Sequence, residues 1–264
     1  MNRAILVLAA ALGVAAPAAA QTLARRVAGV PDGTVHLTYA ARAGVCGNGA
    51  GSISFDCADG NCSRRNVRND PDWDDGPCPC EAGPVRLSLT VAGGHVTRVR
   101  AYVGGRWRSD SGVTDLGVVP AAEAARWLLA LARTGGNRAA DQAVFAATLA
   151  DSITVWPDLL WLARDAAAGS SARNQAVFWL GQAAGAAATK DLTDLAVDGA
   201  VDRDVREHAV FALSQLPRDV GVPALVQIAR TNRDPEVRRK AFFWLGQTHD
   251  PRAVALFEEV LSKP

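Results

Sequence analysis

Four stretches in the second half of the chain decide the fold: DQAVFAATL (141–149), NQAVFWLGQ (174–182), EHAVFALSQ (207–215) and RKAFFWLGQ (239–247). They share an alanine that recurs at intervals of 33, 33 and 32 residues, at Ala143, Ala176, Ala209 and Ala241. An apolar residue follows 16 and again 19 positions after each alanine. Self-similarity with such a period is typical of helical repeats. Each unit is therefore predicted to contain two helices, the first around the shared motif and the second around the downstream apolar positions.

The first helix of each unit is predicted to bury one face. At 100° per residue, the shared alanine lies on the same side as the residues one and four positions after it, and all of these positions are apolar. The residue three after the alanine alternates between small and large, as Ala146, Trp179, Ala212 and Trp244. Such alternation fills the space between stacked neighbours. The two tryptophans are therefore predicted to lie in the core.

A row of phenylalanines occupies the opposite face of these first helices. The position two after the alanine, at 200° from it, holds Phe145, Phe178, Phe211 and Phe243. One turn later, three of the four units carry a glutamine, at Gln182, Gln215 and Gln247. Rings and amides together can bind the side chains and backbone of an extended peptide, so these seven residues are predicted to bind a partner. The alternative is that the next helix layer or the N-terminal domain covers the rings, since apolar residues at helical spacing usually make packing contacts.

The repeat resembles HEAT repeats, in the short bacterial form also seen in phycobilisome-lyase HEAT-like proteins. The resemblance rests on a motif at the first helix of the fourth unit. The motif consists of Asp234, Pro235, Val237, Arg238, Ala241, Leu245 and Gly246. The third unit keeps Asp202, Val205 and Arg206. This resemblance implies an α-solenoid over residues 119–264, with a half-repeat cap at 121–133 followed by four helix pairs. It also implies that the first helices line a concave side and that Asp202, Arg206, Asp234 and Arg238 form an inter-repeat polar ladder. Lyase activity is not expected, because the repeats contain no cysteine and the chain begins with an export signal.

The first 20 residues, MNRAILVLAAALGVAAPAAA, have the form of a secretory signal peptide. Arg3 gives the positive start, an apolar run follows, and small residues at 18–20 suit cleavage. The protein is therefore predicted to be periplasmic or secreted, with no membrane span once the signal is removed. No nucleic-acid partner is expected, because the net charge is close to zero, with 28 Lys and Arg and 27 Asp and Glu.

The five cysteines lie within one short stretch and are predicted to form disulfides, as is usual in an oxidising compartment. They are Cys46, Cys57, Cys62, Cys78 and Cys80. Cys57 is expected to pair with Cys62, and Cys46 with either Cys78 or Cys80. A zinc site is the alternative, but paired C-x-x-C spacing is missing.

Residues 21–118 are predicted to form a small antiparallel β domain that contains these disulfides. Apolar and polar residues alternate at 34–39 and 85–91, as in half-buried strands. A hairpin with the three-residue loop 92–94 is expected, because it pairs Leu89 with Thr97 and Leu87 with Val99 and keeps charge off the buried face. Val96, Arg98, Arg100 and Tyr102 would then face outward. His36 and His95 are expected to be solvated.

A long polar insert at 47–83 interrupts this domain. Its residues Asp70, Asp72, Asp74 and Glu81 stand at loop positions 1, 3, 5 and 12, which is a weak match to a calcium-binding loop. The glycine comes one position late and no helices are expected to flank it, so no metal is assigned. The glycine-rich stretch Gly47–Ser52 lacks the lysine and helix of a phosphate loop and is expected to be flexible.

The sequence thus predicts an α+β fold with two domains, a small antiparallel β domain followed by an α-solenoid of HEAT-like helical hairpins. No triad, metal constellation or cofactor loop is found, so no cofactor is assigned. A non-enzymatic scaffold that binds a protein or peptide along the repeat surface is therefore favoured. The alternatives are a lyase-like or other enzyme with a site at the junction of the two domains, and an envelope-stability module whose repeats only pack on other subunits.

Overall fold

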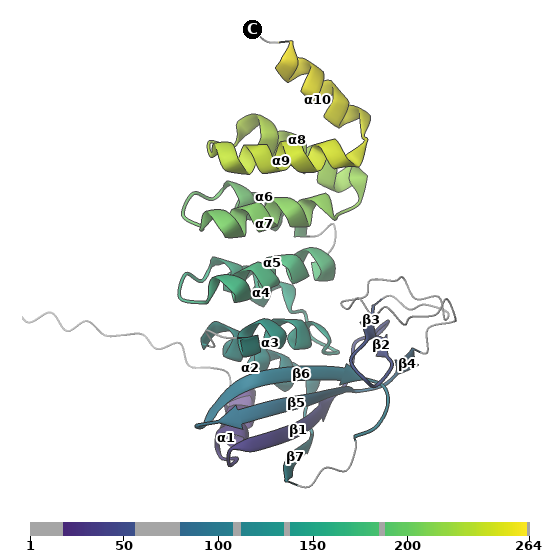
Figure 1. Ribbon diagram of the computed structural model, residues 1–264, viewed down its shortest axis with the longest axis vertical. Coiled ribbons are helices and arrows are strands. Elements are labelled where there is room, and N and C mark those ends of the chain that lie inside the picture. Colours follow the sequence, from purple (N-terminus) through teal and green to yellow (C-terminus); the bar gives the residue numbers. More distant parts are fainter. Residues whose placement is uncertain (1–17, 56–79, 108–111, 135–137, 185–187, 263–264) are drawn as a thin grey trace, which may run out of the picture.

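The chain is an α+β protein in which a small β region is followed by a stack of helices (Figure 1). The computed structural model describes residues 18–55, 80–107, 112–134, 138–184 and 188–262. Most of the predicted signal peptide, at 1–17, lies outside the described residues, so the export signal stays a prediction.

The β region is built on a four-stranded sheet with the order β6-β5-β1-β7. Its strands are β1 (Gly33–Tyr39), β5 (Val85–Ala92), β6 (His95–Val103) and β7 (Val113–Val118). The predicted antiparallel arrangement is correct for β6, β5 and β1 but wrong for β7, which pairs with β1 in parallel. A helix precedes the sheet, α1 (Ala18–Ala28), and its Leu23 and Val27 are buried. This helix is not predicted by the alternation of apolar and polar residues, because its buried Leu23 and Val27 are spaced i, i+4.

The β5–β6 hairpin turns through Gly93 and Gly94, both with positive φ (60° and 73°), and not through the predicted three-residue loop. Ala92 pairs with His95, and Thr97 then forms a bulge, after which Leu89 faces Val99 and Leu87 faces Ala101. The two-residue turn suits the twist of a hairpin, and the bulge restores the buried face. Val96 consequently packs on the core side and not on the outer face as predicted.

A second, three-stranded sheet has the order β3-β2-β4 and consists of β2 (Cys46–Gly47), β3 (Ile53–Ser54) and β4 (Glu81–Ala82). A disulfide joins Cys46 to Cys80, one of the two pairings predicted for Cys46. It links β2 to the residue that precedes β4, across a sequence separation of 34. Cys57, Cys62 and Cys78 lie outside the described residues.

The helical region begins with α2 (Ala121–Thr134) and continues with α3 (Arg138–Thr148), α4 (Trp156–Arg164), α5 (Ser170–Ala184), α6 (Thr189–Val197), α7 (Arg203–Ser214), α8 (Arg218–Thr231), α9 (Pro235–Thr248) and α10 (Pro251–Leu261). The closest packing joins α2 with α3, α4 with α5, α6 with α7 and α8 with α9, so the second helix of one repeat packs mainly on the first helix of the next. Figure 1 shows these pairs stacked one above another, away from the β region, with α10 beyond the last of them. Among the helices of the described residues, none combines the length and apolar character needed to cross a membrane.

The first helices α3, α5, α7 and α9 pack directly on one another in sequence order. The shared alanines Ala143, Ala176, Ala209 and Ala241 are all completely buried. Where α5 meets α7, a Cβ added at Gly181 would stand 3.2 Å from the Cβ of Ala212. Small residues at these contacts therefore let the helix backbones approach closely, which is why the repeat keeps them.

The buried residues of the β region and of the helices form one continuous core. Tyr39 at the end of β1 is fully buried, and its hydroxyl donates a 2.7 Å hydrogen bond to the carbonyl oxygen of Ala146 in α3. The backbone N–H of Val99 in β6 donates to Oε1 of Gln142 at 3.2 Å. The junction between the two regions is thus filled by packed side chains, and the sheet closes the first end of the helix stack.

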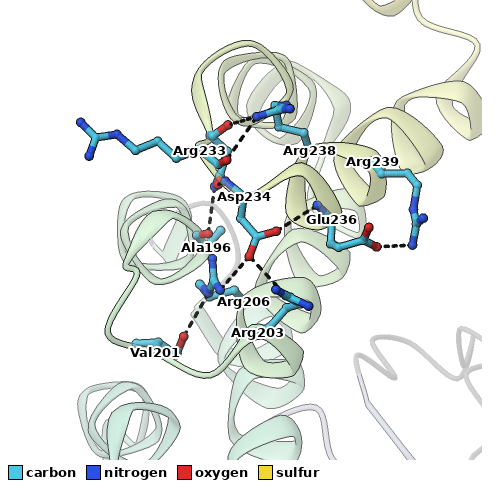
Figure 2. A network of polar contacts seen from close by, with 10 residues as sticks. Ala196, Val201, Arg203, Arg206, Arg233, Asp234, Glu236, Arg238 and Arg239 are labelled. Atoms are coloured by element: carbon cyan, nitrogen blue, oxygen red, sulfur yellow. Dashed lines mark hydrogen bonds and ion pairs between the residues drawn. The ribbon is translucent and has the colours of Figure 1, made fainter.

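Polar contacts connect α5 to α7 and α7 to α9 through the loop before the later helix, and Figure 2 shows those around Asp234. Asp234 caps α9 by accepting a 2.9 Å hydrogen bond from the N–H of Glu236, and it receives Arg206 of α7 at 2.9 Å and Arg203 at 3.3 Å. Arg173 of α5 binds Asp202 at 2.6 Å in the equivalent way. The arginine of one unit therefore pairs with the aspartate of the next. Arg238 has a different role from the one implied by the resemblance, since it donates to the carbonyl oxygens of Asn232 and Arg233.

A second set of ion pairs joins an arginine at the C-terminal end of α2, α4 or α8 to a carboxylate of a later segment. Arg133 contacts Asp165 at 3.1 Å, Arg164 contacts Asp198 at 2.6 Å, and Arg230 contacts Glu259 at 2.6 Å. These side chains are more exposed than Arg206 and Asp234, so solvent screens their attraction more strongly. They help to fix the register of neighbouring units without contributing much to stability.

We expect Asp234→Ala to lower the midpoint of thermal unfolding by several degrees. The change removes a helix cap and leaves the largely buried guanidinium of Arg206 without its carboxylate. Asp194→Ala is the matched control, because its ion pair with Lys190 is exposed and lies within one helix, and it should leave the midpoint nearly unchanged. Equal effects of the two changes, measured by circular dichroism, would show that the Asp234 contacts do not hold the stack together.

Acid should weaken the N-terminal cap of α10, in which the carboxylate of Asp250 binds the backbone and side chain of Arg252. The side chain and the backbone N–H of Arg252 hold the pKa of Asp250 at about 2, below its ordinary 3.8. Because the pKa is depressed in the folded state, this carboxylate stabilises the fold above pH 3.8 and the contribution is lost as the pH falls towards 2. The difference in urea midpoint between the wild type and Asp250→Asn should therefore be constant above pH 3.8 and should close below it. A difference that does not change over this range contradicts the assignment.

Candidate functional site

The four phenylalanines of the predicted row are placed on four successive first helices but are not equivalent. Phe145 is half-buried beneath Phe55, which follows β3, with 6.1 Å between the ring centroids, and it also contacts Trp179 at 5.1 Å. Phe243 at the other end of the row is 54% exposed. Phe178 and Phe211 are half-buried. The β region therefore covers the first ring of the row, and exposure increases towards the C-terminal end.

A cavity of about 400 Å³ opens between α5, α7 and α9, at the middle of the row. Its apolar wall consists of Phe178, Phe211 and Trp244. The ring centroids of Phe211 and Trp244 are 5.0 Å apart, so aromatic contacts continue from one helix to the next. The polar residues at the cavity are Asn174, Gln175, Asp204, Glu207, His208 and Lys240.

Trp179 and Trp244 differ, although the repeat places them at equivalent positions. Trp179 is buried, as predicted. Trp244 is half-buried, packs against the core and also lines the cavity, so the predicted core role describes only part of its surroundings. Both rings pack edge-on against the phenylalanine before them, at 5.0 Å. The difference arises because Trp179 is covered by Phe55 of the β region, at 5.5 Å.

The polar rim of the cavity carries both charges and crosses the helices. Lys240 of α9 binds Glu207 of α7 at 3.3 Å, and the side-chain amide of Asn174 in α5 donates to Asp204 of α7 at 3.3 Å. Nδ1 of His208 lies 2.8 Å from the carbonyl oxygen of Asp204. A carbonyl oxygen only accepts hydrogen bonds, so Nδ1 carries the proton and Nε2 is the acceptor of the neutral ring.

Two polar atoms at this cavity lack a partner within the described part of the chain. They are Oδ1 of Asn174, an acceptor, and Nε1 of Trp244, a donor. The amide of Asn174 is oriented by its bond to the Asp204 carboxylate, which leaves the carbonyl oxygen free of that contact. Both atoms are shielded from solvent, so in this conformation they carry the free-energy cost of an unpaired buried polar group and are not accessible to a ligand.

The glutamines of the predicted row do not line the cavity. Gln215 and Gln247 are exposed, and the amide of Gln215 donates to Ser214. The residues beside the phenylalanines are instead those one turn earlier, such as Gln175 before Phe178 and His208 before Phe211. Side chains on a helix lean towards its N-terminus, so each ring reaches towards the preceding turn. Polar residues one and two positions before each shared alanine were the signal that could have predicted this rim.

The remaining candidate residues are placed as follows. Asp70, Asp72 and Asp74 of the weak calcium match lie outside the described residues, and Oε2 of Glu81 accepts a 2.7 Å hydrogen bond from the N–H of Gly105. Over the ranges that the structure covers, no three His, Cys, Asp or Glu side chains lie close enough to hold a metal ion. His36 is not solvated as predicted but is buried against Trp107, with 3.6 Å between the ring centroids.

No model of a known protein family matches the chain, and a search of the curated proteins found no match either.

Phe145→Ala should destabilise the protein far more than Phe243→Ala. Phe145 lies between Phe55 and Trp179, so its removal leaves a cavity and costs about 2–4 kcal/mol. Phe243 is 54% exposed, and its loss should cost less than about 1 kcal/mol. Urea unfolding followed by tryptophan fluorescence measures both changes. Similar losses for the two variants would mean that the β region does not cover the end of the row.

Proposed function

We propose that the protein is an exported, non-enzymatic scaffold whose helix pairs form a HEAT-like α-solenoid and whose first helices hold an extended segment of a protein partner. The observation that carries this proposal is the cavity of about 400 Å³ that crosses α5, α7 and α9. Phe178, Phe211 and Trp244 form its apolar wall. Tryptophan and other aromatic anchors in such pockets dominate the energy of many protein interfaces.

A polypeptide fits this surface better than other classes of macromolecule. Its side chains can insert between the aromatic rings, while its backbone supplies both donors and acceptors for polar residues at the rim such as Gln175. Asp204 and Glu207 at the rim would repel a phosphate backbone. The presence of Lys240 beside these acids favours a segment with mixed charge.

The solenoid assignment is supported by the buried alanines and by the ion pairs between units. Each pair buries its apolar face on the next, and such arrays offer extended binding surfaces. Export is supported by the N-terminal sequence at 1–20 and fits the disulfide between Cys46 and Cys80.

A selection of random peptides displayed on phage, with the disulfide-bonded protein as bait, tests the proposal. Enriched peptides are synthesised, and their dissociation constants are measured by calorimetry for the wild type and for Phe211→Ala. The affinity should fall at least about 30-fold, because the loss of an aromatic anchor costs about 2 kcal/mol or more.

Trp161→Ala is the control, since this ring is 49% exposed but lies on α4, a second helix, beneath Arg133. It should leave peptide affinity unchanged. Circular dichroism establishes that Phe211→Ala keeps its helix content. The proposal fails if no peptide is enriched, or if Phe211→Ala and Trp161→Ala bind the enriched peptides equally.

A further inference from the structure

A second cavity, of about 470 Å³, lies on the face of the large sheet that points away from the helical core. Alternate residues of a strand face opposite sides of a sheet. Val35, Leu37, Leu87 and Leu89 are fully buried in the core, and the residues between them line this cavity. The strand residues at the cavity are Thr34, His36, Arg86, Ser88, Arg100 and Tyr102.

The glycine-rich stretch that was expected to be flexible forms one rim of this cavity. Gly49 lies against Gly105, so close that a Cβ on Gly105 would stand 3.0 Å from the Cα of Gly49. Oδ1 of Asn48 accepts hydrogen bonds from the N–H groups of Ala50 and Ser52, which shapes the loop. The disulfide at Cys46 ties the start of this stretch to β4. The rim is therefore a built structure that depends on glycine for the close approach of two backbone segments.

Arg86 of β5 holds the two backbone segments together from inside the cavity. It is 6% exposed, and it donates to the carbonyl oxygens of Gly104 and Gly49 at 2.6–3.0 Å. Its guanidinium also lies 4.8 Å from the ring centre of Trp107 and 5.6 Å from that of Tyr102. Burial lowers the pKa of Arg86, and the nearby Tyr102 and Glu81 partly oppose this shift. A buried cation held only by carbonyls and rings gains stability from an anion.

The charge around the cavity is positive. Arg100 and Arg106 line it together with Arg86, and none of the three forms an ion pair with a carboxylate in the parts of the chain that the structure describes. Two acidic residues, Glu81 and Asp115, lie on neighbouring elements. The carboxylate of Glu81 already accepts a hydrogen bond from the backbone N–H of Gly105, and that of Asp115 accepts one from the N–H of Gly117. Three arginines that converge on one concave site provide the donors that carboxylate and phosphate groups require.

We propose that this cavity binds a small organic anion, with a carboxylate or phosphate group between Arg100, Arg106 and Arg86 and its body against Trp107. The volume of about 470 Å³ is in the range of small-molecule sites. The hydroxyls of Thr34 and Ser88 lie at the same site and add hydrogen-bonding groups for the rest of the molecule. This site is independent of the peptide site on α5, α7 and α9.

Calorimetric titration of the disulfide-bonded protein with inorganic phosphate and with citrate, at constant ionic strength set by sodium chloride, tests the proposal. At least one of the two anions should bind saturably, and the one that binds more tightly identifies the anionic group. Arg100→Gln and Arg106→Gln should each weaken this binding at least about tenfold, because charge-assisted hydrogen bonds are lost. Both residues are exposed, so the variants should fold, whereas changes at Arg86 would also disturb the rim.

Arg98→Gln is the matched control. Arg98 is an exposed arginine on the same strand, and the same unit of charge is removed, but it does not line the cavity. It should change the affinity less than about twofold, as expected for a screened surface charge. The proposal is overturned if neither anion binds saturably to the wild type, or if Arg98→Gln weakens binding as much as Arg100→Gln does.

Discussion

The structure depends on the close packing of successive first helices, each of which buries a small residue at the shared position. Ala143, Ala176, Ala209 and Ala241 are all excluded from solvent, and Gly181 against Ala212 brings two helix backbones nearer still. Dispersion and hydrophobic burial at these contacts are short-ranged, so one larger side chain would separate two units. The separation would also part Arg173 from Asp202 and Arg206 from Asp234, because those ion pairs span the same interfaces. A change that separates two units therefore breaks the apolar contacts and the ion pairs between them at the same time.

This packing also determines which residues remain for binding. A helix that buries one face in its neighbours places the position two after the shared alanine on the other face, which explains why that position can be aromatic without entering the core. What happens to each ring then depends on its neighbours. Phe55 covers Phe145 and Trp179, whereas Phe211 and Trp244, farther from the sheet, line an open cavity. The open cavity therefore lies where the cover from the β region ends.

The sequence was sufficient to predict the features that repeat. The helix pairs, the buried alanines and the alternating strands follow from periodicity, because a period of 33 residues or of two residues reports which side is buried. Features that depend on contacts between distant segments could not be predicted in this way. The bulge at Thr97 reverses the choice of hairpin loop. The order of the glycine-rich stretch comes from Gly104, Gly105 and the buried Arg86, which are more than 30 residues away along the chain. The polar rim of the cavity could not be predicted from a shared motif, because the residues at equivalent positions, such as Gln175 and His208, are polar but differ in type.

The junction between sheet and helices bears on how the two cavities are related. A flexible linker would leave them to move independently, but here the hydroxyl of Tyr39 binds Ala146, the N–H of Arg42 binds the carbonyl oxygen of Leu149, and the buried side chains are continuous. Such contacts resist relative motion, since any hinge would open a close-packed core and leave a buried hydroxyl unpaired. Phe55, close along the chain to the glycine-rich rim, also contacts the first ring of the helical row. The sheet therefore holds the cavity lined by Arg86, Arg100 and Arg106 and the aromatic row at a fixed separation and orientation, which suits the scaffold that we propose.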